Sequence, residues 1–168
     1  IHSQYSICEG AIKIDDLKKH CKENKIQSVG LSDTSNLCGA LEFAENLSKV
    51  GTQPIIGTQI NFKFKEYTGL LPLFAMNNQG YKKIIELSSK SYLENDGLSD
   101  PYCDFIELKN NNFGTAIFSG SIDGLIGTLF NQGKYEYIDE IYSTLLSVYK
   151  DRFYIEIQRH NDLNEEVF

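Results

Sequence analysis

The sequence has little arginine and no long apolar run, and each shortage excludes a class of protein. Two of its 16 basic residues are arginine, against 23 acidic residues, and the net charge is −7. This charge opposes broad contact with a phosphate backbone, so we expect DNA to be contacted only indirectly. The longest clean apolar stretch is residues 69–76, far short of the ~20 residues that span a membrane. We therefore expect no membrane partner.

Closely spaced cysteines are also missing. The four cysteines lie at positions 8, 21, 38 and 103, a spacing that matches neither a zinc knuckle nor the dense disulfide framework of a small secreted protein. The chain opens with neither a methionine nor a signal peptide. We expect reduced thiols, a cytoplasmic location, and two ends that are cuts in a longer chain, so that 1–168 forms the N-terminal part of a single domain.

What the sequence does contain is typical of a folded α/β domain. Its 168 residues, 41% of them hydrophobic, are enough to build a core without disulfides. Helical spacing of apolar residues predicts helices over 14–24, 37–47, 81–93, 102–108 and 135–149, with a brief one before Gly133. Apolar runs predict strands over 26–31, 53–64, 70–76, 115–118 and 153–158. This alternation favours a mostly parallel sheet, with 53–64 and 70–76 pairing antiparallel, and a site at the C-terminal strand ends.

Five segments resemble, in order, motifs of the PHP domains, the polymerase and histidinol phosphatase family, in the form carried by the alpha subunit of bacterial DNA polymerase III. The segments are Ile1–Gly10, Gly30–Gly39, Gln53–Gly57, Ala75–Tyr81 and Arg152–His160. Several spaced matches in order are far more specific than one short motif. The resemblance implies a distorted TIM-like barrel of about seven parallel strand and helix units, truncated here before its last strands.

The resemblance also implies a cluster of divalent metals, and six of its ligand positions fall within this chain. Two of them, His2 and Glu9, keep a ligand side chain. The other four have lost it: a His is replaced by Thr34 and by Leu70, an acid by Gln59 and a Cys by Ser121.

Two surviving ligands are too few for a divalent ion, because Leu cannot coordinate and Thr, Gln and Ser are weak neutral donors. We therefore predict no catalytic residue and no cofactor, with His2 and Glu9 as a hydrogen-bonded pair at a vestigial site. The alternative is that the pair retains a single zinc, manganese or magnesium ion. We also expect five of the positions to gather at one face of the sheet: His2, Glu9, Thr34, Gln59 and Ser121.

The resemblance implies a role in DNA replication. The parent chain would be a DNA-directed DNA polymerase, a nucleotidyltransferase, and this domain a non-catalytic part that supports the rest of the alpha chain and docks the proofreading exonuclease subunit. The alternative is an active metal-dependent phosphoesterase or 3'-5' exonuclease, which an Asp-x-His motif after Phe168 would favour. A barrel without its last strands leaves an unpaired edge, so we further expect self-association through that edge, or pairing with the residues that follow.

Overall fold

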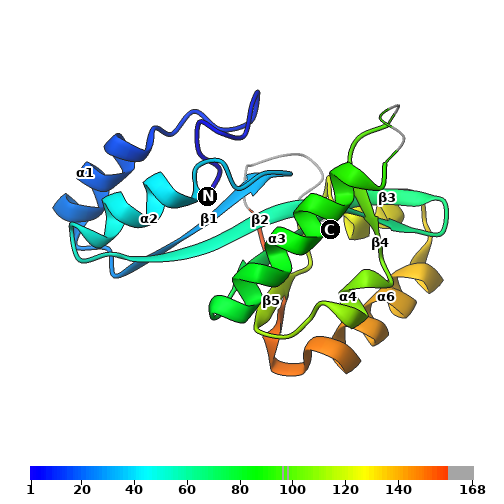
Figure 1. The fold of residues 1–168 in the computed structure, drawn as a ribbon. Helices are drawn as coiled ribbons and strands as arrows, with labels where there is room; N and C mark the ends of the chain where they lie inside the picture. Colours follow the sequence, from blue (N-terminus) through cyan, green and yellow to red (C-terminus); the bar gives the residue numbers. More distant parts are fainter. Residues whose placement is uncertain (96, 98, 159–168) are drawn as a thin grey trace.

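The computed structural model describes residues 1–95, 97 and 99–158 (Figure 1). Its helices are α1 (Ile14–Asn24), α2 (Ala40–Ser48), α3 (Asn78–Leu93), α4 (Glu107–Asn110), α5 (Leu125–Asn131) and α6 (Tyr135–Tyr149), and a 3-10 turn, η1 (Lys150–Arg152), follows α6. Its strands are β1 (Ser28–Thr34), β2 (Gln53–Phe64), β3 (Tyr67–Ala75), β4 (Tyr102–Asp104), β5 (Thr115–Phe118) and β6 (Phe153–Tyr154). The predicted alternation of helices and strands is confirmed.

The sheet is mixed, which corrects the expectation of a mostly parallel one. Its order is β1-β2-β3-β5-β6, and β4 lies beside the second half of β2. β2 and β3 form the expected antiparallel hairpin, but β5 then pairs antiparallel with β3 as well. The remaining pairs, β1 with β2, β2 with β4 and β5 with β6, are parallel. Among the described strands β1 does not pair with β6, so the sheet stays open rather than closing into a barrel.

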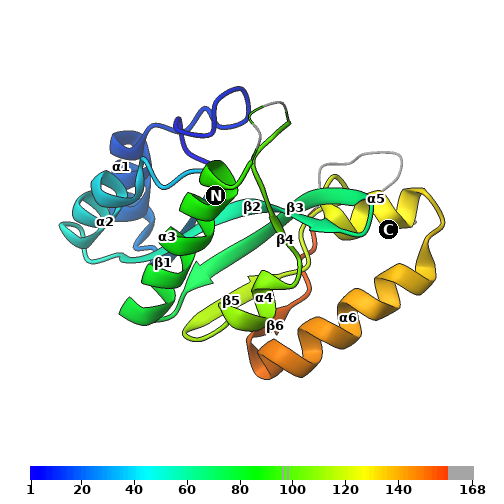
Figure 2. The same ribbon diagram turned by 45° about the vertical axis from the view of Figure 1, so that its right-hand side comes forward.

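The two faces of the sheet differ because side chains alternate along a strand. Cross-strand partners place Leu31, Ile60, Leu71 and Ile117 on one face, where the helices bury them. Figure 2 shows α1 and α2 grouped over one end of the sheet and α5 and α6 at the other, with α3 between them. The buried residues accordingly form a small cluster under α1 and α2 and a larger one under α3, α5 and α6.

The opposite face carries a row of aromatic rings. The rings of Phe74 and Phe118 lie 4.8 Å apart, and those of Phe118 and Tyr154 lie 5.4 Å apart, which links β3, β5 and β6. Thr34 and Gln59 belong to this same face, since they are direct partners in the β1–β2 ladder. The face that carries two of the predicted site positions is therefore distinct from the face that carries the helices.

Two expected elements differ from the structure. Residues 102–108 were expected to be one helix, but β4 and α4 share this segment, because Tyr102 and Cys103 pair with Asn61 and Phe62 of β2 and so satisfy their backbone groups in the sheet. The strand expected over 153–158 is restricted to Phe153–Tyr154. Beyond it, the N–H of Glu156 donates to the hydroxyl of Ser119 rather than to a neighbouring strand.

The start of α3 explains one of the motif segments in structural terms. The side chain of Asn77 accepts hydrogen bonds from the backbone N–H groups of Gln79 and Gly80, which is the standard N-cap arrangement. Met76 N–H donates to the carbonyl of Gly114, so the same segment also joins the end of β3 to the loop before β5. The motif Ala75–Tyr81 thus positions a helix.

In the part of the chain that the structure describes, no helix is both long and apolar enough to cross a membrane.

Candidate functional site

The candidate site lies where the loop of residues 2–10 folds over the ends of the β1–β2 ladder. Ile1 extends the sheet past β1, because its carbonyl accepts the N–H of Ser32 at 2.8 Å. The loop then returns, and Gln4 N–H donates to the carbonyl of Ile12 at 2.9 Å. Gly10 makes this return possible, since a Cβ at that position would lie 2.0 Å from the carbonyl oxygen of Ser3. The loop therefore brings His2 and Glu9 to the strand ends.

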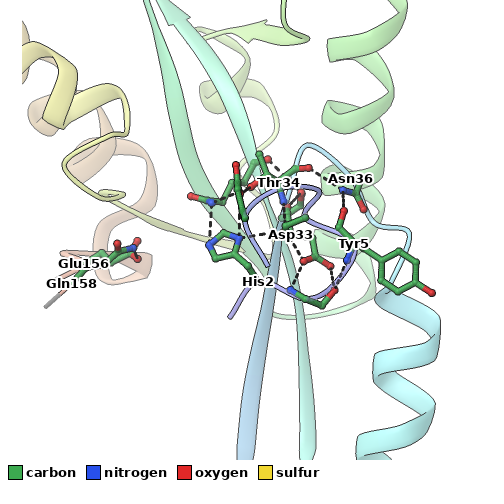
Figure 3. A network of polar contacts seen from close by, with 12 residues as sticks. His2, Tyr5, Asp33, Thr34, Asn36, Glu156 and Gln158 are labelled. Atoms are coloured by element: carbon green, nitrogen blue, oxygen red, sulfur yellow. Dashed lines mark hydrogen bonds and ion pairs between the residues drawn. The ribbon is translucent and has the colours of Figure 1, made fainter. Parts of the chain in front are cut away.

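Four of the predicted positions form one hydrogen-bonded cluster. Thr34 Oγ1 donates to Glu9 Oε2 at 2.5 Å, and Gln59 Nε2 lies 3.2 Å from His2 Nε2 and 3.4 Å from Thr34 Oγ1. His2 Nδ1 lies 3.7 Å from Glu9 Oε2, so the contacts run in a ring through all four side chains. Figure 3 shows His2 to the left of Asp33 and Thr34 above Asp33, with dashed lines marking the contacts of this cluster. Four of the five positions that were expected to gather are thus linked by contacts in the structure.

The ring also indicates the tautomer of His2. When the Gln59 amide donates from Nε2, the facing His2 Nε2 must accept, and the ring proton then lies on Nδ1. That nitrogen is 3.4 Å from the hydroxyl of Ser6 and near the carboxylate of Glu9. Both nitrogens of the imidazole thus face groups of this chain.

A buried carboxylate that sequence reasoning did not single out lies beneath this ring. Asp33 is fully buried, and it accepts three hydrogen bonds: from Ser3 N–H at 2.6 Å, from Ser3 Oγ at 2.7 Å and from Ser6 Oγ at 2.7 Å. The Ser6 hydroxyl also accepts the N–H of Thr34. Short bonds to a carboxylate are stronger than bonds between neutral groups. Asp33 therefore fixes the loop that carries His2 and Glu9.

Asn36 and Tyr5 anchor the outer side of the same loop. The Asn36 side-chain N–H group donates to the carbonyls of Tyr5 and Thr34, and its oxygen accepts the N–H of Cys38. The Tyr5 hydroxyl donates to Glu42 of α2 at 2.7 Å, and this bond raises the pKa of Tyr5. These contacts tie the loop to α2. A polar residue that follows a strand, two positions after a ligand position, is the signal that would have pointed to Asn36.

The two remaining predicted positions are in β3 and in the turn after β5. Leu70 is in β3, opposite Asn61 of β2, and not at the start of the strand. Ser121 belongs to the turn after β5, where Gly120 has a φ of +79° and where a Cβ would lie 3.1 Å from the Leu70 carbonyl oxygen. The Ser121 hydroxyl accepts the N–H of Asp123. In the part of the chain that the structure describes, no hydrogen bond joins Leu70 or Ser121 to the ring.

The segment after β6 also borders the site. Figure 3 draws Glu156 and Gln158 to one side of the ring, and Gln158 Nε2 donates to Glu156 Oε1 at 2.5 Å. Arg159 and His160, the last residues of the fifth motif, lie outside the described residues.

The donor set does not fit a cluster of divalent ions. Such ions require several carboxylates, imidazoles or thiolates that converge on one point. Within residues 1–95, 97 and 99–158, no group of three or more His, Cys, Asp or Glu side chains is placed to hold a metal ion. The ring offers one imidazole and one carboxylate, and the neutral side chains of Thr34 and Gln59 already bond to them. No reaction step through a metal can be derived from this arrangement.

An open mixed sheet with helices over one face, and with a polar site where the β1–β2 ladder ends, defines an α/β domain. A family model described as "PHP domain" matches residues 1–160. The chain therefore belongs to the PHP domain family, and the resemblance found in the motifs is confirmed.

Relatives that this chain resembles in sequence are much longer proteins. DNA polymerase III subunit alpha from Caulobacter vibrioides is 36% identical over 95% of this chain, and the match covers 15% of the relative. The subunits from Rickettsia felis and Haemophilus influenzae are 34% and 32% identical over 99% and 98% of this chain, and 14% of each is covered. The chain thus spans about a seventh of the length of these relatives. A crystal structure assigned to a metal-dependent phosphoesterase from Bifidobacterium adolescentis matches 90% of this chain and 55% of that one, with 14% identity and a TM-score of 0.43.

Proposed function

We propose that this chain is the PHP domain of a bacterial replicative polymerase and that it acts without catalysis, as a structural part of the alpha chain. The observation that carries the proposal is the closed ring of contacts among His2, Glu9, Thr34 and Gln59. At the positions where the family resemblance implies metal ligands, neutral side chains bond to the two ligands that remain. The ring and the buried Asp33 join the loop of residues 2–10 to β1 and β2.

The test is to measure metal content and phosphoesterase activity in the full-length chain that contains this domain. We expect less than one equivalent of zinc, manganese or magnesium after gel filtration, and no metal-stimulated hydrolysis of p-nitrophenyl phosphate. The matched variants are His2→Ala and His20→Ala, since His20 lies on α1, outside the site. One or more equivalents of tight metal, with hydrolysis lost in His2→Ala and kept in His20→Ala, would make the metal-dependent phosphoesterase or 3'-5' exonuclease the correct function.

The second part of the proposal is that the domain docks the proofreading exonuclease subunit. The net charge of −7 supports a protein partner over direct contact with DNA. We expect the full-length chain to bind the purified exonuclease subunit, and we expect deletion of residues 1–168 to abolish binding while the rest of the chain still extends a primer. Binding that survives the deletion would assign the docking surface to another part of the polymerase.

A further inference from the structure

A groove opens at the other end of the β1–β2 ladder from the site. Its volume is about 390 Å³, and it lies between α2, the first residues of β2 and the segment that leads from β3 into α3. Leu41, Met76 and Tyr81 line it and are exposed, Leu41 by 72% and Met76 by 57%. Three of the exposed large hydrophobic side chains are thus gathered around one cavity rather than scattered over the surface.

Among the residues that the structure describes, the lining of this groove contains no charged side chain. Pro54, Ile55 and Ile56 contribute from β2, and the polar members of the lining are uncharged amides such as Gln53 and Asn77. Charged residues make up 23% of the chain, so their absence from a lining of this size is a departure from the rest of the surface. Depletion of charge and enrichment of aromatic and Met side chains are typical of the core of a protein interface.

We propose that this groove is the docking site for the polypeptide that follows residue 168 in the full-length chain. The inference rests on the proposed function, because it takes the domain to be a structural part of a longer polymerase. The relatives match this chain with only 14–15% of their length, so most of the protein lies outside the domain. Permanent interfaces are more apolar than transient ones, and an uncharged groove with exposed Leu41 and Met76 fits a permanent neighbour in the same chain better than an exchanging subunit.

Met76 makes the proposal measurable, because it is the one methionine among the 168 residues. Oxidation of methionine by peroxide follows the exposure of the sulfur. The experiment treats the native full-length chain with hydrogen peroxide and follows the sulfoxide in the tryptic peptide 66–82 by mass spectrometry. If the groove is covered, Met76 oxidises roughly tenfold more slowly than in the urea-unfolded chain; in an open groove, a side chain that is 57% exposed would oxidise at a rate within about twofold of the unfolded one.

Two variants test whether the lining of the groove holds the polypeptide that covers it. Leu41→Arg places a charge in the lining and is expected to raise the oxidation rate of Met76 to near the unfolded value. Leu93→Arg is the matched control: Leu93 is 82% exposed at the end of α3 and is not part of the lining, so Met76 should stay protected.

The proposal is overturned if Met76 in the native chain oxidises as fast as in the unfolded chain. It is also overturned if protection depends on the concentration of the chain, which would indicate a second copy, or on added exonuclease subunit. Metal content and hydrolysis, which test the proposed function, do not depend on Met76, so the two proposals fail separately.

Discussion

The two ends of the β1–β2 ladder differ in how their surface groups are satisfied. At the end that includes Thr34 and Gln59, the polar side chains bond to one another, and the carboxylate of Asp33 holds the covering loop. At the end that begins with Gln53 and Pro54, apolar side chains line an open groove. At the first end the ring side chains bond to one another, whereas the second end leaves apolar area in water. The comparison teaches that one ladder can combine an end whose polar side chains bond to one another with an end that exposes apolar side chains, so the two ends call for separate variants.

The largest expected change in the free energy of unfolding comes from removal of the Asp33 carboxylate. Asp33→Ala would leave the N–H of Ser3 and the hydroxyls of Ser3 and Ser6 without their acceptor in a buried place, at a cost of roughly 3 to 5 kcal/mol. Urea unfolding followed by circular dichroism measures the change. Asp123→Ala, at an exposed position, is the control and should stay within about 0.5 kcal/mol of the parent. A similar small effect for Asp33→Ala would mean that the loop is not held as described, and the contrast between the two ends would weaken.

The next effect is a fall in the free energy of unfolding at alkaline pH, and it arises in the larger core cluster. Tyr149 is buried beside Thr115, at the start of β5, and burial raises its pKa to about 12 against an ordinary value of 10.0. The folded state therefore keeps the phenol proton at a pH where the unfolded state has lost it. This contribution is fully present below pH 10, and the free energy of unfolding falls by roughly 2 to 3 kcal/mol as the pH rises from 10 to 12.

Tyr149→Phe tests this assignment, because phenylalanine fills nearly the same volume without a titrating group. Its unfolding free energy, measured in urea at pH 9, 10.5 and 12, should fall less steeply than that of the parent. The control is Tyr135→Phe, since Tyr135 is exposed. Equal slopes for the parent and Tyr149→Phe would assign the alkaline loss to other groups, with Cys103 the first to examine, because burial raises the pKa of its thiol to about 11.

The unpaired edge of the sheet at β6 should have an effect of intermediate size on stability and self-association. β6 pairs with β5 alone in the described residues, and Ile155 and Ile157 beyond it are exposed. An unpaired edge with apolar neighbours invites pairing with another chain. We expect the 168-residue chain to self-associate in light-scattering measurements, and we expect a version extended by the next residues of the gene to melt several degrees higher, as ~2 kcal/mol would produce in a domain of this size. A monodisperse 168-residue monomer with no gain from the extension would contradict this expectation.

The sequence predicted the hairpin, the main helices and four members of the site, and its failures have physical causes. Thr34 and Gln59 could be placed together because the family resemblance assigns both to metal-ligand positions, and the β1–β2 ladder pairs them directly. Asp33 could not be, because alternation puts it on the helix-covered face beside Leu31, where a carboxylate is acceptable only if the serines of a distant loop reach it. The segment 102–108 has a helical apolar spacing of its own, but pairing with β2 outweighs this local preference, and only the folded sheet shows that pairing.

The smallest expected effect is the coupling energy between His2 and Glu9. Together with the response to added metal, it tests whether the pair holds an ion. The two side chains are partly exposed and 3.7 Å apart, so a double-mutant cycle with His2→Ala and Glu9→Ala should give a coupling below about 1 kcal/mol. Adding zinc or manganese should leave the melting temperature unchanged, because a ligand that does not bind the folded state cannot stabilise it. A rise of several degrees that disappears in His2→Ala and persists in His20→Ala would show that the pair still holds an ion. The two ends of the ladder would then both depend on a partner, one on a metal and one on a polypeptide.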